Sequence, residues 1–130
     1  LEGFLPEPVR SRCRHVVGEN HRTLAAVEAL QQGDLACLGQ LMAESHRSLR
    51  DDYQVSCPEL DRMVRLAQSF PGVYGARMTG GGFGGCTVNL VAEERADDFS
   101  RHIHEEYEKE TGITPCLYRS APSAGAQELS

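Results

Sequence analysis

The sequence of 130 residues contains no tryptophan, only three methionines and no window that approaches 18 consecutive apolar residues. It therefore offers no transmembrane helix, and its N-terminus lacks the charged and apolar segments of a secretory signal. Its net charge of −6 at pH 7 leaves no basic surface for nucleic acid. The five cysteines are odd in number and form no CxxC pair, which argues against a zinc site or a disulfide scaffold. We expect a cytoplasmic protein with free thiols, without a zinc site and without a membrane or nucleic-acid partner.

The remaining composition is that of an ordinary globular protein, with 40% hydrophobic and 25% charged residues. A chain of this length suits one domain of modest core. We divide it into an N-terminal stub at residues 1–8, one domain at residues 9–119 and a flexible tail at residues 120–130, which is rich in Ser, Ala, Gly and Pro.

Apolar residues recur every three or four positions in four segments, which predicts helices at about 9–32, 35–53, 58–70 and 94–111. Gly33 is expected to end the first helix, and Asp34 to cap the second. Ser56 and Glu59 have the spacing of a capping box that starts the third helix. The positions expected to face the core are Leu60, Met63, Val64, Ala67, Ala96, Phe99, Ile103 and Tyr107.

Two segments, Val73–Met78 and Cys86–Val91, alternate with a period of two and predict antiparallel strands joined by a short connection. Helices are expected to cover one face of this sheet. A third strand, Ile113–Arg119, is predicted at an edge because Pro115 interrupts it.

The connection between the first two strands carries five glycines in the six positions 80–85. Glycine reaches positive φ at little cost, and successive exposed amides can form a nest that binds an anion such as phosphate. A mobile hairpin tip is the alternative. The pattern differs from the standard phosphate loops because no Gly-Lys-Ser/Thr follows it and a strand comes next.

Three segments carry a more specific signal: Met78-Thr79-Gly80-Gly81-Gly82-Phe83-Gly84-Gly85-Cys86, Ser45-His46-Arg47-Ser48-Leu49-Arg50-Asp51-Asp52-Tyr53 and Ser56-Cys57-Pro58-Glu59-Leu60-Asp61. Together they closely resemble the C-terminal part of the galactokinase family, within the GHMP small-molecule kinase superfamily. The resemblance extends from about Val9 to Tyr118. It implies an α+β fold, the ferredoxin-like GHMP kinase C-terminal domain with extra helices, here lacking its first strand. Because that strand is a central one, we expect the chain alone to fold marginally or to self-associate.

The resemblance also implies an activity, the ATP-dependent phosphorylation of the anomeric hydroxyl of galactose with Mg²⁺. The site residues that it implies here are those of the cofactor-binding loop, Thr79, Gly80, Gly81, Gly82, Phe83, Gly84 and Gly85. Thr79 would add a hydroxyl contact, and the Phe83 side chain would fix the loop by packing. The loop is expected to pack against an N-terminal kinase half. The catalytic residues and magnesium ligands belong to that half, so the chain alone is expected to be inactive.

Alternatives remain open: a kinase for N-acetylgalactosamine, a catalytically inactive galactose-sensing regulator, or a ferredoxin-like module that binds a small anion by itself. Arg50, Asp51 and Asp52 form a possible phosphate or metal cluster, but we favour a structural role for them at a helix end, tied to the Ser56 cap. The five histidines show no spacing typical of metal ligands. The arginines of the first helix are interpreted as a solvated helix face; they are Arg10, Arg12, Arg14 and Arg22.

Overall fold

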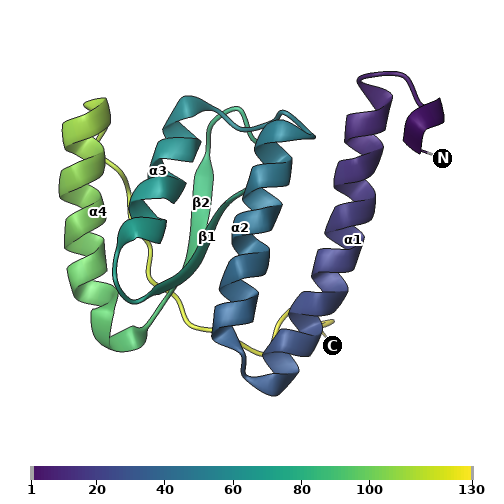
Figure 1. Ribbon diagram of the computed structural model, residues 1–130. Helices are drawn as coiled ribbons and strands as arrows, with labels where there is room; N and C mark the ends of the chain where they lie inside the picture. The colour runs from purple at the N-terminus through teal and green to yellow at the C-terminus, as the bar shows by residue number, and fades with distance from the viewer. Residues whose placement is uncertain (1, 130) are drawn as a thin grey trace.

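A computed structural model describes residues 2–129, and it confirms an α+β fold of helices on a small antiparallel sheet (Figure 1). The elements within this range are α1 (Val9–Gln32), α2 (Leu35–Asp51), α3 (Pro58–Ser69), β1 (Val73–Thr79), β2 (Cys86–Val91) and α4 (Ala96–Thr111), with short 3-10 helices at Glu2–Phe4 and Glu93–Arg95. Figure 1 shows α2 and α3 lying across the hairpin, with α4 beside α3 and α1 beside α2. None of the described helices combines the length and apolarity needed to span a bilayer.

The core lies between the helices and one face of the hairpin. The main cluster joins α3, β1 and α4 through Val64, Leu66, Ala67, Ala76, Phe99, Ile103 and Tyr107. A smaller cluster of Leu49, Leu60 and Met78 lies at the end of β1 that leads into the glycine-rich connection. The core positions predicted from periodicity are buried or partly buried, because a helix repeats its inward face every three to four residues.

The helix ends follow the predicted signals in two cases and depart in a third. Gly33 has a left-handed φ of 70°, and the Asp34 carboxylate accepts a hydrogen bond from the Cys37 amide at 2.9 Å. The capping box at Ser56 was wrong. Because α3 begins directly at Pro58, the N-cap position falls to Cys57, and the Ser56 hydroxyl donates instead to Asp61 at 2.6 Å.

The hairpin has the predicted antiparallel pairing, with Met78 opposite Thr87 and Ala76 opposite Asn89. The side chains of Ala76 and Met78 are fully buried beneath the helices, whereas Val88 on the opposite face is 46% exposed. This exposure leaves one face of β2 uncovered by the described residues.

The third strand, predicted at Ile113–Arg119, does not form. The segment instead runs back along α4, where Thr114 bonds to Glu108 at 2.8 Å and Arg119 to Asp97 at 3.2 Å. In a ferredoxin-like sheet of order 4-1-3-2 the last strand pairs only with the first. Residues 2–129 contain no strand in that first position, so the segment Ile113–Arg119 has no partner strand with which to form hydrogen bonds.

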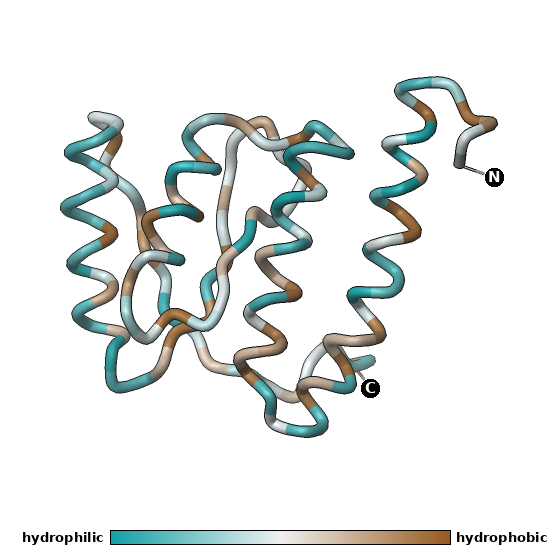
Figure 2. Tube along the Cα trace, in the orientation of Figure 1, coloured by the Kyte–Doolittle hydropathy of each residue, from teal (hydrophilic) through white to brown (hydrophobic). Residues whose placement is uncertain are grey.

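The first helix buries little of its apolar stripe. Its buried residues are His15 and Ala29, whereas Val16, Leu24 and Leu30 are 52%, 71% and 58% exposed. Figure 2 shows brown, hydrophobic segments at intervals along this helix, which flanks the rest of the fold. Amphipathic spacing therefore predicted the helix correctly but not the burial of its face.

Candidate functional site

The glycine-rich loop at residues 80–85 is built on backbone conformations that favour glycine. Gly80, Gly82, Gly84 and Gly85 have φ values of 81°, 86°, 141° and 99°. Phe83 also has a positive φ, of 60°. Since side-chain-bearing residues rarely adopt such angles, the shape of the loop favours glycine at these four positions.

One backbone hydrogen bond anchors the loop to the connection between α2 and α3. The Phe83 amide donates to the Val55 carbonyl oxygen at 2.7 Å, and the Val55 amide donates in turn to the Leu49 carbonyl at 3.0 Å. Gly82 lies so close that a Cβ there would be 2.1 Å from the Val55 oxygen. The loop tip is therefore pressed against backbone, and only glycine fits at residue 82.

Other amides of the loop carry no such backbone anchor. Within residues 2–129, the amides of Gly81, Gly82 and Gly84 make no backbone hydrogen bond outside the strands. A loop with free amides and no side chains in the way suits the oxygen atoms of a phosphate group.

The Phe83 side chain is 75% exposed among the described residues, so this chain alone does not bury the ring. The loop is held by the Phe83 amide instead. The ring borders a groove of about 700 Å³ between α1 and the loop, which is also lined by Arg12, Cys13, Val16, Val17, Tyr53, Gln54 and Val55.

The strand that leads into the loop is bound by a buried histidine. The Met78 amide donates to Nδ1 of His46 at 3.1 Å, and Nε2 of His46 lies 2.9 Å from the Asp61 carboxylate. Since an amide is a donor only, Nδ1 accepts and the ring hydrogen is on Nε2. The spacing of the histidines gives no sign of this role, because the contact is to a backbone amide 32 residues away.

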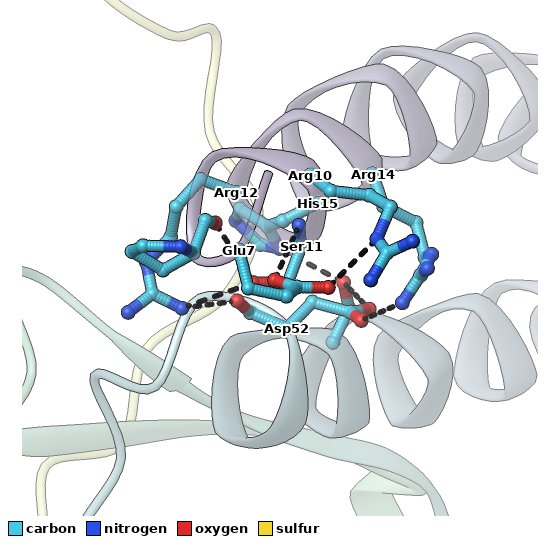
Figure 3. Close-up of polar contacts among 9 residues, drawn as sticks. Glu7, Arg10, Ser11, Arg12, Arg14, His15 and Asp52 are labelled. Carbon is cyan, nitrogen blue, oxygen red and sulfur yellow. Dashed lines mark hydrogen bonds and ion pairs between the residues drawn. The ribbon is translucent and has the colours of Figure 1, made fainter. Parts of the chain in front are cut away.

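A second polar cluster joins the start of α1 to the end of α2 (Figure 3). Arg12 donates to the Asp52 carbonyl and to Gln54, while Arg14 pairs with the Asp52 carboxylate at 3.1 Å. Figure 3 shows the two arginines reaching Asp52 from opposite sides. The interpretation of the arginines as a solvated face was therefore wrong for Arg12, which is partly buried, whereas Arg14 stays exposed while it pairs with Asp52.

Arg22 and Glu19 form another link, since Glu19 accepts from Arg22 at 2.6 Å and from Ser45 at 2.9 Å, and lies 4.0 Å from Arg77. Burial raises the pKa of Glu19, but the hydrogen bonds from Arg22 and Ser45 outweigh it, so the pKa is lowered. Arg22 is thus paired, and Glu19 joins α1 to α2 and β1.

His15 is buried within the α1–α2 contact. Its Nδ1 lies 2.9 Å from the Ser48 hydroxyl, which donates to Asp52 at 2.9 Å, and its ring stacks on Tyr53 with centroids 4.6 Å apart. The Ser48 hydroxyl donates its single hydrogen to Asp52, so it must accept from His15, and Nδ1 of His15 is the donor. Burial lowers the pKa of His15, and the nearby Glu19 opposes that effect only in part.

Asp51, part of the cluster considered for phosphate or metal, forms a local pair. It accepts from Arg50 at 2.8 Å in an exposed contact, and this hydrogen bond lowers the pKa of Asp51. Neither residue bonds to Ser56, so the predicted tie to a cap at Ser56 is not formed. Across the described residues, no group of three or more His, Cys, Asp or Glu side chains is placed to hold a metal ion.

Comparison with known proteins gives a consistent result. The family description "GHMP kinases C terminal" matches residues 26–109. Human galactokinase is 57% identical over 118 residues, which are 91% of this chain and 29% of the human enzyme. Galactokinase of Roseiflexus sp. is 52% identical over 121 residues, which are 93% of this chain and 31% of that enzyme. The chain thus spans less than a third of the length of these curated relatives.

A solved structure has the same fold. The crystal structure of Lactococcus lactis galactokinase complexed with galactose superposes with a TM-score of 0.81 at 43% identity. The match covers 85% of this chain and 29% of that one.

Proposed function

The chain belongs to the GHMP kinase family, whose C-terminal part it carries, and we propose that the protein containing it is a galactokinase. The reaction is transfer of the γ-phosphoryl group of ATP to the anomeric hydroxyl of galactose, assisted by Mg²⁺. The identity of 57% to human galactokinase carries the choice of substrate. We propose a cytoplasmic location, because the five cysteines are free thiols, which suit a reducing compartment.

The glycine-rich loop supports the part that this chain plays. ATP supplies the transferred phosphoryl group, and phosphoryl transfer depends mainly on positioning and on neutralising negative charge. The free amides of Gly81, Gly82 and Gly84 suit phosphate oxygens, and the anchor at Val55 keeps them in place. The residues proposed to form the nucleotide-binding loop are Thr79, Gly80, Gly81, Gly82, Phe83, Gly84 and Gly85.

The rest of the site is proposed to belong to an N-terminal half, against which the loop packs. The described residues of this chain place no carboxylate cluster at the loop that would suit Mg²⁺. Because the chain matches only the C-terminal part of its relatives, the magnesium ligands and the catalytic base are expected in that half, and the chain alone is expected to transfer no phosphate.

Release of ADP by the protein that contains this chain tests the proposal. The protein is supplied with ATP and Mg²⁺ and with galactose, N-acetylgalactosamine or no sugar. Turnover only with galactose supports a galactokinase, whereas turnover only with the acetylated sugar replaces the substrate and keeps the chemistry. A folded protein that binds galactose without turnover would be a regulator instead. Residues 1–130 alone, assayed in parallel, are expected to release no ADP.

A further inference from the structure

The last buried residue of β1 is held from outside the sheet. The Met78 amide is bound by Nδ1 of His46 on α2, at 3.1 Å, and not by a strand. Met78 is fully buried and His46 is 4% exposed, so water does not compete for this contact. A buried amide that lost its acceptor would be left unpaired, which is costly.

Asp61 of α3 determines which nitrogen of His46 can accept. Its carboxylate oxygen lies 2.9 Å from Nε2 of His46 and also accepts from the Ser56 hydroxyl at 2.6 Å. A carboxylate accepts hydrogen bonds and does not donate them when ionised, so it holds the ring hydrogen on Nε2. Nδ1 is therefore kept free to accept from Met78.

The contact to Met78 and the contact to Val55 lie on either side of the first half of the loop. His46 holds the chain immediately before Thr79, and the Val55 oxygen holds Phe83 at 2.7 Å. The residues between these two attachments are Thr79–Gly82. Their backbone position is set from both ends by α2 and by the connection that follows it.

We propose that His46, oriented by Asp61, is a positioning residue for the nucleotide-binding loop. The proposal rests on the proposed function, because the ligand whose position matters is the phosphate chain of ATP. His46 touches no reacting atom: it acts through the Met78 amide, which fixes where the loop amides stand. Loss of this contact lets Thr79–Gly82 move. It therefore weakens the binding of ATP and leaves the binding of the sugar unchanged.

Two substitutions separate the two bonds of the ring. In His46→Asn the side-chain oxygen stands near the place of Nδ1 and can accept from Met78, but the contact to Asp61 is lost. In His46→Gln the longer amide reaches the place of Nε2 and can donate to Asp61, but the Met78 amide loses its acceptor. The same pair of changes at His102 is the control, because this partly buried histidine of α4 packs against Phe70 and contacts no residue of the loop.

The test measures the KM for ATP, the KM for galactose and kcat in the protein that contains this chain. We expect His46→Gln to raise the KM for ATP about tenfold, as for a buried amide without its acceptor. The KM for galactose should change less than about twofold. His46→Asn should stay within about threefold for ATP, and the His102 variants should match the unchanged protein.

A second readout does not depend on catalysis. Amide hydrogen exchange at Met78–Gly85 should accelerate in His46→Gln and stay close to the unchanged rate in His46→Asn. If the unchanged protein shows no turnover while exchange follows this order, the proposed function fails and the positioning of the loop stands. Equal exchange in the two His46 variants, or equal changes in KM for ATP and galactose, would overturn the role of His46.

Discussion

Gly39 of α2 and Gly75 of β1 pack backbone against backbone. A Cβ on Gly75 would lie 2.6 Å from the Gly39 Cα, and a Cβ on Gly39 would lie 1.7 Å from the Tyr74 carbonyl oxygen. His46 follows Gly39 by about two helical turns, on the same face of α2. The close approach at the two glycines thus brings α2 near enough to β1 for His46 to reach the Met78 amide.

Replacement of Gly39 by alanine is expected to separate α2 from β1. Because the added methyl group meets backbone atoms that cannot rotate away, the loss in free energy of unfolding should reach at least about 3 kcal/mol. Urea unfolding measures it. Gly3→Ala, where nothing lies within 4 Å, is the control and should change stability by less than about 0.5 kcal/mol. A similar small change for Gly39→Ala would contradict the packing.

The glycines of the loop are expected to differ in their tolerance of alanine. Gly82→Ala places a methyl group against the Val55 oxygen at a φ of 86°, so it should displace the loop and raise the KM for ATP at least about tenfold. Gly81 has open space around it and no positive φ, so Gly81→Ala should stay within about twofold. Steady-state kinetics of both variants decides the point, and equal effects would count against the described loop.

Stability is expected to fall in mild acid because of His15. Burial lowers the pKa of His15 in the folded chain below its ordinary value of 6.5. The unfolded chain therefore takes up a proton first as the pH drops. The stabilisation is complete above pH 6.5 and is lost as the pH falls from there toward the folded pKa, by at most about 1.4 kcal/mol per pH unit.

Urea unfolding at about pH 7.5 and about pH 5.5 measures this loss. His15→Asn is the matched variant, because its side-chain amide can still donate to Ser48 but does not titrate. The unchanged chain should lose more stability between the two pH values than the variant does. If both lose the same amount, the pH dependence comes from other groups.

Residues 1–130 in isolation are expected to fold marginally or to self-associate. The sheet of the described residues has two strands, and β2 pairs on one side only with β1, so its other edge is open. Light scattering over a range of protein concentrations measures association. A stable monomer with slow amide exchange throughout Val73–Met78 and Ile113–Arg119 would refute the expectation.

Local patterns predicted most of the fold. The spacing of Leu60 and Val64 on α3, and of Phe99 and Ile103 on α4, identified core positions because periodicity and burial are linked along one helix. The prediction of a strand at Ile113–Arg119 was wrong. Alternation of apolar residues shows that a segment suits a sheet, but it does not show that a partner strand is present.

The site was predicted in part for the same reason. Five glycines in six positions identified the loop, but nothing local distinguishes Gly82, which touches Val55, from Gly81, which is open. The contact between His46 and Met78 joins residues 32 apart in the chain, and it arises only when α2 packs on β1. Whether the loop binds ATP stays a prediction.

The two hydrogen bonds that anchor the loop differ in their sensitivity to substitution. The bond from Phe83 to Val55 joins main-chain atoms only, so side-chain replacements that keep the backbone conformation leave it intact. The bond from Met78 ends on the side chain of His46, and one substitution removes it. The anchor at Val55 therefore persists as long as the fold does, whereas the anchor at His46 can be lost or regained by a single substitution.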